Sequence, residues 1–422
     1  MIEYKKHTLP NGLTIIAHRD NVSEMAAVNM LYKVGARNED PARTGFAHLF
    51  EHLMFRGTKD IPDFDSPVQL ACGESNAFTT NDYTNFYITM PRDNVETALW
   101  LESDRMEGLR IDQRSLSAEK KVVIEEFNQR YLNQPYGDQW MLLRSMAYRV
   151  HPYRWATIGM TPEHIEKATL ADVKAFYHKY YQPGNAVLAI AANVEPDRVF
   201  EMAERWFGDI PSGEVPSDVI PVEPEQTSAR RLEVRRAVPS DAITIAFPMG
   251  RRKNREFYLC DLLSDILAGG TSGRLYQALV KERKIFGNVN AYITGDLDPG
   301  LFVVTASLMP GVTPGEGEEA LWEELRKTQG EPVTDYEMEK VKNKFEAVTI
   351  YGELNVMNKA LNLAFYDMLG DLELVNGEVA IYGSITPAEV MAAARKIFRP
   401  ERSSTLIYIA DNEEAAQRAD EK

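Results

Sequence analysis

The spacing of hydrophobic and polar residues changes several times along the chain, and each change predicts a new element. Apolar side chains that alternate with polar ones, or run continuously for a few residues between turn residues, indicate strands. Apolar side chains that recur every three to four residues indicate helices. The predicted elements are a turn and strand at 9–18, strands at 26–34, 75–80 and 84–90, a short helix at 68–71 and longer helices at 93–108 and 117–131. Strands interleaved with long helices predict an α+β fold.

One succession of elements occurs twice. A helix that begins after Thr169 ends at Pro183 and leads into an apolar strand, and the same order returns between Thr386 and Pro400. Both threonines and both prolines repeat at one offset, 217 positions. A fixed offset of this kind indicates a duplicated domain.

A segment rich in proline, glycine and acidic residues separates the two copies. It covers residues 210–226 and predicts an extended linker. We therefore place a domain boundary near residue 222, with an N-terminal domain at 1–222 and a homologous C-terminal domain at 223–422.

A short stretch before the first long helix carries candidate chemistry. If residues 46–54 form a helix, His48, Glu51 and His52 project from one side, because positions i, i+3 and i+4 share a face. Two imidazoles beside a carboxylate suit a catalytic Zn²⁺, and the pattern H-x-x-E-H is the inverted zinc motif. Apolar residues surround this polar face, namely Phe46, Leu49, Phe50, Leu53 and Met54. Because buried polar groups without partners are costly, a bound metal would explain them.

These residues and their neighbours resemble a known family. The stretches at 35–40 (Gly-Ala-Arg-Asn-Glu-Asp), 44–48, 51–52 and 55–58 (Phe-Arg-Gly-Thr) are similar to the signature of the pitrilysin, insulin-degrading enzyme and mitochondrial processing peptidase family. The chain has the size of its two-domain, half-length branch. The resemblance implies a zinc metalloendopeptidase made of two homologous α+β domains, each a mostly antiparallel sheet with helices packed on one side.

Two histidines leave the zinc site one protein ligand short, and a carboxylate is the expected third. The predicted helix at 117–131 offers Glu119, Glu125 and Glu126. Glu119 and Glu126 are seven residues apart and share one stripe. Val122 and Val123 lie between them, so we expect this stripe to be buried.

Glu125 falls instead on the side of Lys121, which predicts an exposed ion pair. We therefore select Glu126 as the third ligand. The family pattern agrees, since an apolar triplet is followed by two glutamates and the second binds zinc. Glu119 is expected to assist catalysis by orienting a ligand or sharing its hydrogen bonds, and Glu51 to act as general base. The predicted cofactor is one Zn²⁺ per chain, with Mn²⁺ as the alternative.

Composition excludes other classes of function. The net charge of −16 argues against a nucleic-acid partner, which needs clustered lysine and arginine. No apolar run is long enough for a membrane helix, and the first residues lack the apolar core of a signal peptide. Cys72 and Cys260 are expected to be free thiols in a reducing compartment. These features predict a cytoplasmic protein, or a periplasmic one if an N-terminal segment has been removed.

The histidines are unevenly distributed, since none lies beyond position 178. The second half therefore cannot supply an imidazole, and we expect it to help enclose the substrate.

We expect His151 to be structural. The glycine-rich stretch 269–274 lacks the Gly-Lys-Ser/Thr ending of a phosphate loop.

The family resemblance also implies where the substrate binds. Asn76, Ala77, Phe78 and Thr79 are similar to the edge strand along which a peptide substrate adds through main-chain hydrogen bonds. We therefore expect peptides or unfolded polypeptide segments as substrates.

One departure from the family pattern predicts a partner. Many members carry an arginine, and a tyrosine seven positions later, that reach the substrate carbonyl. Here Lys281 and Asn288 occupy those positions, and Arg283 and Tyr292 have the wrong spacing. We therefore expect a dimer with a chamber, favouring a heterodimer with a homologous subunit that supplies the pair, with a homodimer as the alternative. Two competing hypotheses are a non-catalytic scaffold subunit and a regulatory peptide-binding module.

Overall fold

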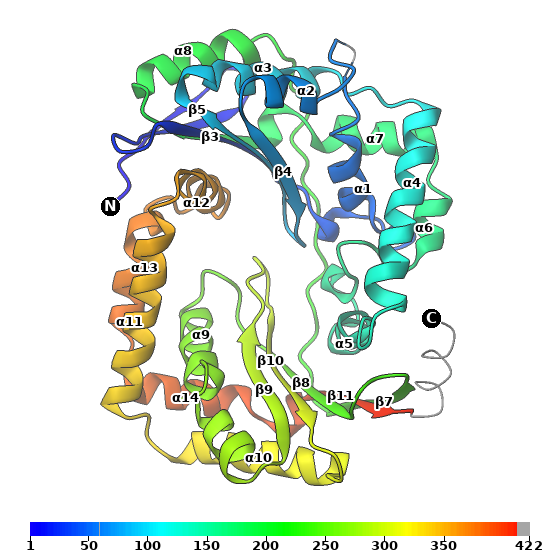
Figure 1. Ribbon diagram of the computed structural model, residues 1–422, viewed down its shortest axis with the longest axis vertical. Coiled ribbons are helices and arrows are strands. Elements are labelled where there is room, and N and C mark those ends of the chain that lie inside the picture. The colour runs from blue at the N-terminus through cyan, green and yellow to red at the C-terminus, as the bar shows by residue number, and fades with distance from the viewer. Residues whose placement is uncertain (59, 412–422) are drawn as a thin grey trace. The chain divides into compact units, whose positions relative to one another are not determined.

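The computed structural model describes residues 1–58 and 60–411 (Figure 1). The chain forms two compact units, each assembled from three segments. Unit 1 contains Met1–Phe127, Trp155–Pro221 and Thr349–Glu378, and unit 2 contains Asn128–Arg154, Val222–Val348 and the described residues from Val379 onward.

Unit 1 is built on a six-stranded sheet with the order β1-β2-β6-β3-β5-β4. The pair β2–β6 is parallel and the other neighbours are antiparallel, so the sheet is mostly antiparallel, as the family resemblance implies. The strands are β1 (Lys5–Thr8), β2 (Thr14–Arg19), β3 (Met25–Tyr32), β4 (Glu74–Thr79), β5 (Thr84–Pro91) and β6 (Ala186–Ala192). Strand β4 lies at an edge and has one strand neighbour.

Helices pack against this sheet. Helices α3 and α8 contact one face, and α12, from much later in the chain, contacts β3 and β6 on the other (Figure 1). Seven of the eight residues of β3 are buried, which fits a strand covered on both faces. The helices of unit 1 are α1 (Phe46–Leu53), α2 (Asp65–Leu70), α3 (Val95–Glu107), α4 (Gln113–Phe127), α6 (Pro162–Glu166), α7 (Leu170–Tyr180), α8 (Pro196–Phe207) and α12 (Val356–Met368).

Unit 2 repeats this plan on a five-stranded sheet with the order β7-β11-β8-β10-β9. The parallel pair is β7–β11, which corresponds to β2–β6, and the edge strand β9 corresponds to β4. The strands are β7 (Arg230–Arg236), β8 (Ala242–Pro248), β9 (Phe286–Ile293), β10 (Leu301–Leu308) and β11 (Ser404–Ala410). Its other helices include α5 (Gln139–Ala147), α9 (Arg255–Ala268), α10 (Pro314–Gly330) and α14 (Pro387–Ile397). Helices α11 (Asp335–Gly352) and α13 (Leu374–Gly383) cross from one unit into the other.

The duplicated helix predicted from Thr169 and Thr386 is present in both units. Each threonine side chain accepts a hydrogen bond from the backbone N–H three residues later, and the acidic side chain there, Asp172 or Glu389, bonds back to the threonine. This reciprocal capping starts α7 and α14 at equivalent places.

The short helical turns are 3₁₀ or π in form. They are η1 (Ala36–Asn38), η2 (Arg92–Asn94), η3 (Asn128–Leu132), η4 (Pro152–Arg154), η5 (Pro183–Asn185), η6 (Tyr276–Glu282) and η7 (Pro400–Arg402). The helix predicted at 117–131 is therefore α4 followed by a π-helical turn, and it begins earlier than expected.

Two segments are exchanged between the repeats. The units divide at Pro221–Val222, but α5 from the first half packs on the sheet of unit 2, and α12 from the second half packs on the sheet of unit 1. A division of the chain at residue 222 alone therefore differs from the contact units. Each sheet is covered by a helix on its second face. The sequence of such a helix shows that one side is apolar, but it does not show which of the two sheets the helix will cover.

Candidate metal centre

A buried carboxylate fixes the start of α1. Glu39 accepts hydrogen bonds from the backbone N–H groups of Gly45 and Ala47, both at 2.8 Å. Burial raises the pKa of Glu39 to about 8, although these N–H groups oppose the rise. Gly45 has φ +91°, and a Cβ there would lie 2.5 Å from the carbonyl oxygen of Ile158. Only glycine fits this turn, so the helix begins at a defined residue.

Helix α1 presents both predicted imidazoles on one side. The rings of His48 and His52 lie 4.9 Å apart between centroids and are nearly perpendicular. His48 is buried and His52 partly exposed. The i, i+4 spacing thus gives the common face expected from sequence.

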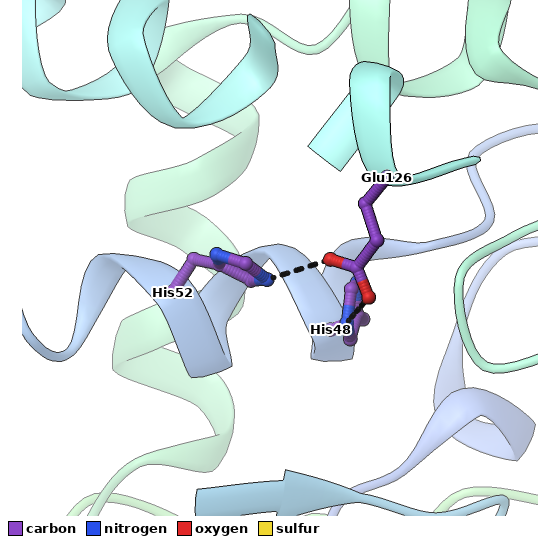
Figure 2. Close-up of side chains that lie close together, drawn as sticks. All are labelled: His48, His52 and Glu126. Carbon is purple, nitrogen blue, oxygen red and sulfur yellow. Dashed lines mark ion pairs between the residues drawn. The ribbon is translucent and has the colours of Figure 1, made fainter. Parts of the chain in front are cut away.

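Glu126, at the end of α4, reaches both rings (Figure 2). Its Oε1 lies 3.6 Å from His48 Nε2, and its Oε2 lies 3.2 Å from His52 Nε2. One ligand atom from each of the three residues lies within 4.8 Å of the others.

The donor set can be tested against a tetrahedral zinc ion. Ligand bonds of about 2.0–2.1 Å place neighbouring ligand atoms roughly 3.3 Å apart in a tetrahedron. The two contacts use different oxygens of Glu126: Oε1 lies 3.6 Å from His48 and Oε2 lies 3.2 Å from His52, and each distance is close to that value. Two imidazole nitrogens and one carboxylate oxygen also form a known catalytic zinc set that leaves one position for water. These three residues therefore fit the metal that the motif predicts.

Glu119 contacts His52 on the opposite side of the ring from Glu126. Its Oε2 is 3.4 Å from Nδ1 of His52, the ring nitrogen opposite the one near Glu126, and it also forms an ion pair with Arg56. Although burial raises the pKa of Glu119, bonds to His52 and Arg56 outweigh that effect and lower it. Burial lowers the pKa of His52, but Glu119 and Glu126 outweigh it and raise the value to about 9. Glu119 can thus orient the His52 ring.

The stripe that carries these glutamates is buried less completely than expected. Val123 is buried, as predicted, but Val122 is 42% exposed, so its assignment to the buried face was wrong. A stripe with a seven-residue repeat is narrow, and Val122 lies beyond its edge. Glu125 is exposed, as predicted.

Glu51 shares helix α1 with the histidines and contacts the edge strand. Its Oε2 accepts a hydrogen bond of 2.7 Å from the hydroxyl of Thr79 in β4. This bond ties the predicted general base to the predicted substrate strand. Asn76, Ala77 and Phe78 precede Thr79 in β4 and pair on one side with Tyr87, Phe86 and Asn85 of β5.

Lys281 and Asn288 both lie exposed in unit 2, on η6 and β9. Arg283 and Tyr292, the residues nearby in sequence whose spacing differs from the family pattern, each contact another side chain. Arg283 is held by Glu323 in an ion pair of 2.6 Å. The Tyr292 ring packs 6.0 Å from that of Trp140, and burial raises its pKa to about 12.

His151 has the surroundings expected of a structural residue. It is 3% exposed, its ring lies 4.2 Å from that of Tyr153, and its Nε2 lies 3.4 Å from Asp298.

Sequence reasoning missed two residues that support the site. Arg56 follows His52 by four positions, so helical spacing could have suggested a shared partner. Glu39 gave no local signal, because its contact with α1 depends on the fold of the intervening turn.

Within residues 1–58 and 60–411, the helices lack the combination of length and hydrophobicity that crossing a bilayer requires.

The sheet plan and the His–His–Glu cluster define a two-domain protein of the inverted zinc-motif class. Comparison with known proteins specifies it further. Residues 14–159 match the model described as "Insulinase (Peptidase family M16)", and residues 167–345 match "Peptidase M16 inactive domain". The chain belongs to peptidase family M16, in its half-length, pitrilysin-like branch.

Similar proteins agree with this assignment. The zinc protease PqqE of Helicobacter pylori is 28% identical over 96% of this chain and 92% of its own length. An uncharacterised zinc protease of Streptomyces coelicolor is 26% identical over 98% of this chain and 91% of its own. The crystal structure of a Helicobacter pylori protease has a TM-score of 0.91 at 27% identity, covering 97% of this chain and all of that one.

Pitrilysin shares the fold at 18% identity. Its TM-score is 0.78, and the match covers 97% of this chain but 45% of pitrilysin. This chain therefore corresponds to about half of that longer protein.

Proposed function

We propose that this chain is a zinc metalloendopeptidase that cuts peptides or unfolded polypeptide segments. The observation that carries the proposal is the convergence of His48, His52 and Glu126 within 4.8 Å, with Glu51 on the same helix. Relatives that are named zinc proteases over almost their full length support it.

The residues have separate roles in this proposal. His48, His52 and Glu126 would hold Zn²⁺, with Mn²⁺ as the alternative. When bound, the metal would supply Lewis-acid polarisation and make a water acidic enough to ionise near neutral pH. Glu51 would accept the proton from the attacking water and then give it to the leaving amine.

The edge strand supports the choice of a polypeptide substrate. Strand β4 pairs with β5 on one side, so its other side can offer main-chain groups to an extended segment. The bond from Thr79 to Glu51 would keep the base beside such a segment. Main-chain recognition favours broad sequence specificity.

A glutamine at position 51 tests the chemistry. Glu51→Gln keeps the size and the hydrogen bond of the side chain but cannot accept a proton. We expect unchanged zinc content, measured by atomic absorption, and loss of cleavage of an unfolded protein. A Glu51→Gln variant that still cuts would refute the role of the base.

We also propose that a homologous subunit completes the site, forming a heterodimer with an enclosed chamber. The exposed Lys281 and Asn288, and the engagement of Arg283 and Tyr292 elsewhere, support a missing Arg–Tyr pair. The purified chain should then bind zinc but cleave slowly until the partner is added. Full activity from the single chain, or from a homodimer, with Lys281→Ala and Asn288→Ala tolerated, would contradict this.

A second candidate is a non-catalytic scaffold or peptide-binding subunit. The missing Arg–Tyr pair and the match of residues 167–345 to an inactive-domain model favour it. A chain that binds no zinc and cleaves nothing with any partner would support this alternative.

A further inference from the structure

Unit 2 contains a cavity of about 660 Å³ beside the start of β9, which we call the lysine pocket. The side chains that matter for its chemistry are Gln277, Val280, Lys281, Lys284, Phe286 and Met309. Its volume lies within the range of about 300–1,000 Å³ typical of ligand sites. Among the residues that the structure describes, no histidine or predicted metal ligand lines it.

The pocket is positively charged within an acidic protein. The whole chain has 63 acidic and 47 basic residues, yet none of the described residues lining this pocket is acidic. Lys281 and Lys284 form no ion pair with a described carboxylate. Two arginines that are close to these lysines in sequence are paired with carboxylates: Arg274 with Glu337 and Arg283 with Glu323, both at 2.6 Å. Two uncompensated ammonium groups at one cavity attract an anionic group.

Hydrogen bonds hold one side of the pocket in place. The Lys281 ammonium donates to Oε1 of Gln277 at 3.3 Å, and Nε2 of Gln277 donates to the carbonyl oxygen of Thr271 at 2.5 Å. Gln277 thus links the glycine-rich turn to η6. Lys284 has φ +54°, a left-handed conformation that turns the chain from η6 into β9.

Apolar side chains form the rest of the lining. Phe286 is 1% exposed and Val280 is half-buried, while Met309 is 41% exposed although it is large and hydrophobic. A ligand that matches this pocket therefore combines an anionic group with a neighbouring apolar group.

We propose that the lysine pocket binds an acidic residue, flanked by an apolar one, in an extended polypeptide. Phe286 and Gly287 belong both to the pocket and to β9, the edge strand of its sheet. An edge strand offers unpaired main-chain groups beside the pocket, which favours a polypeptide over a small free anion. In the proposed peptidase, the pocket would select acidic substrates, and this selection rests on the proposed function. Binding of the acidic segment to the pocket does not depend on that function.

Calorimetric titration tests the binding without cleavage. The protein is the full chain with Glu51→Gln, and the ligand is an acetylated, amidated peptide of about ten residues with a central Glu-Leu. A matched peptide carries Gln-Leu. We expect the Glu-Leu peptide to bind about tenfold more tightly, and a Lys281→Ala/Lys284→Ala double variant to lose that preference. Lys253→Ala, which removes an exposed lysine outside the pocket, should retain it.

Three results of the peptide titrations would overturn the proposal. They are equal affinity for the two peptides, an unchanged preference in the double variant, and an equal loss of preference in Lys253→Ala. Inorganic phosphate that displaces the peptide at a similar concentration would show a free-anion site and also refute the polypeptide ligand. If the chain binds no zinc and cleaves nothing with any partner subunit, the proposed peptidase function fails while these binding results remain valid.

Discussion

The hydroxyl of Thr79 donates a hydrogen bond of 2.7 Å to Glu51, and it thereby joins the edge strand of unit 1 to the helix of the metal cluster. A hydroxyl that donates to a carboxylate stabilises its charged form and limits its rotamers. Position 79 should therefore influence the reaction through Glu51 and not through the metal.

Replacing this hydroxyl should slow cleavage. In Thr79→Val the side chain keeps its shape but loses the donor. A hydrogen bond to a charged group contributes about 1.5–3 kcal/mol, so we expect kcat to fall by about 10- to 100-fold. Zinc content should stay unchanged, and Thr79→Ser should retain most of the activity. A Thr79→Val enzyme with unchanged kcat would show that Thr79 does not position the base.

Arg56 should affect metal affinity indirectly, through Glu119 and His52, although it is not itself a predicted metal ligand. It forms an ion pair with Glu119, which lies 3.4 Å from Nδ1 of His52. Loss of a group that orients a metal ligand typically weakens metal binding by about 10- to 100-fold. We expect that weakening in Arg56→Ala, measured by competition with a chromogenic zinc chelator. Arg56→Lys keeps the charge but not the planar donor geometry and should be intermediate.

The exchanged helices predict a crossed pattern of destabilisation. Leu363 in α12 and Leu143 in α5 are both fully buried. Each leucine-to-alanine change should cost about 2–5 kcal/mol of unfolding free energy. Hydrogen exchange should locate the effect of Leu363→Ala in β3 and β6, and that of Leu143→Ala in β8 and β11. Asn362→Ala, at an exposed position of α12, is the control. The swapped positions of α5 and α12 would be contradicted if Leu143→Ala increased hydrogen exchange in the sheet of unit 1 and Leu363→Ala increased it in the sheet of unit 2.

The sequence predicted much of the local structure of the first half and proposed the residues of the metal cluster. Alternation and helical spacing located the strands and helices, and the repeat at Thr169 and Thr386 indicated two similar units, since capping and turn chemistry are local. The spacing of His48 and His52 placed both rings on one face. The resemblance helped to choose Glu126.

Long-range relationships could not be predicted in the same way. The contact of Glu39 with α1 and the exchange of α5 and α12 depend on which distant elements meet. A helix that covers a sheet needs only an apolar face, and many partners would satisfy it. Composition likewise could not predict the lysine pocket. Nothing in the sequence distinguishes Lys281 and Lys284 from other lysines, because the absence of carboxylates from the described pocket lining depends on the fold.

The ion pair between Arg274 and Glu337 predicts how acid affects unit 2. The bond to Arg274 is the main cause that lowers the pKa of Glu337 to about 2, against an ordinary value of 4.5. A carboxyl group whose pKa is lower in the folded state adds stability above its unfolded pKa, and loses that contribution as pH falls from about 4.5 to about 2. Because both side chains are partly exposed, we expect a contribution of the order of 1 kcal/mol. Glu337→Gln should therefore be less stable than the unmodified chain in urea unfolding at neutral pH, and the difference should shrink as pH falls through this window. A difference that stays constant with pH would show that hydrogen bonding, and not the charge of Glu337, stabilises this corner of the fold.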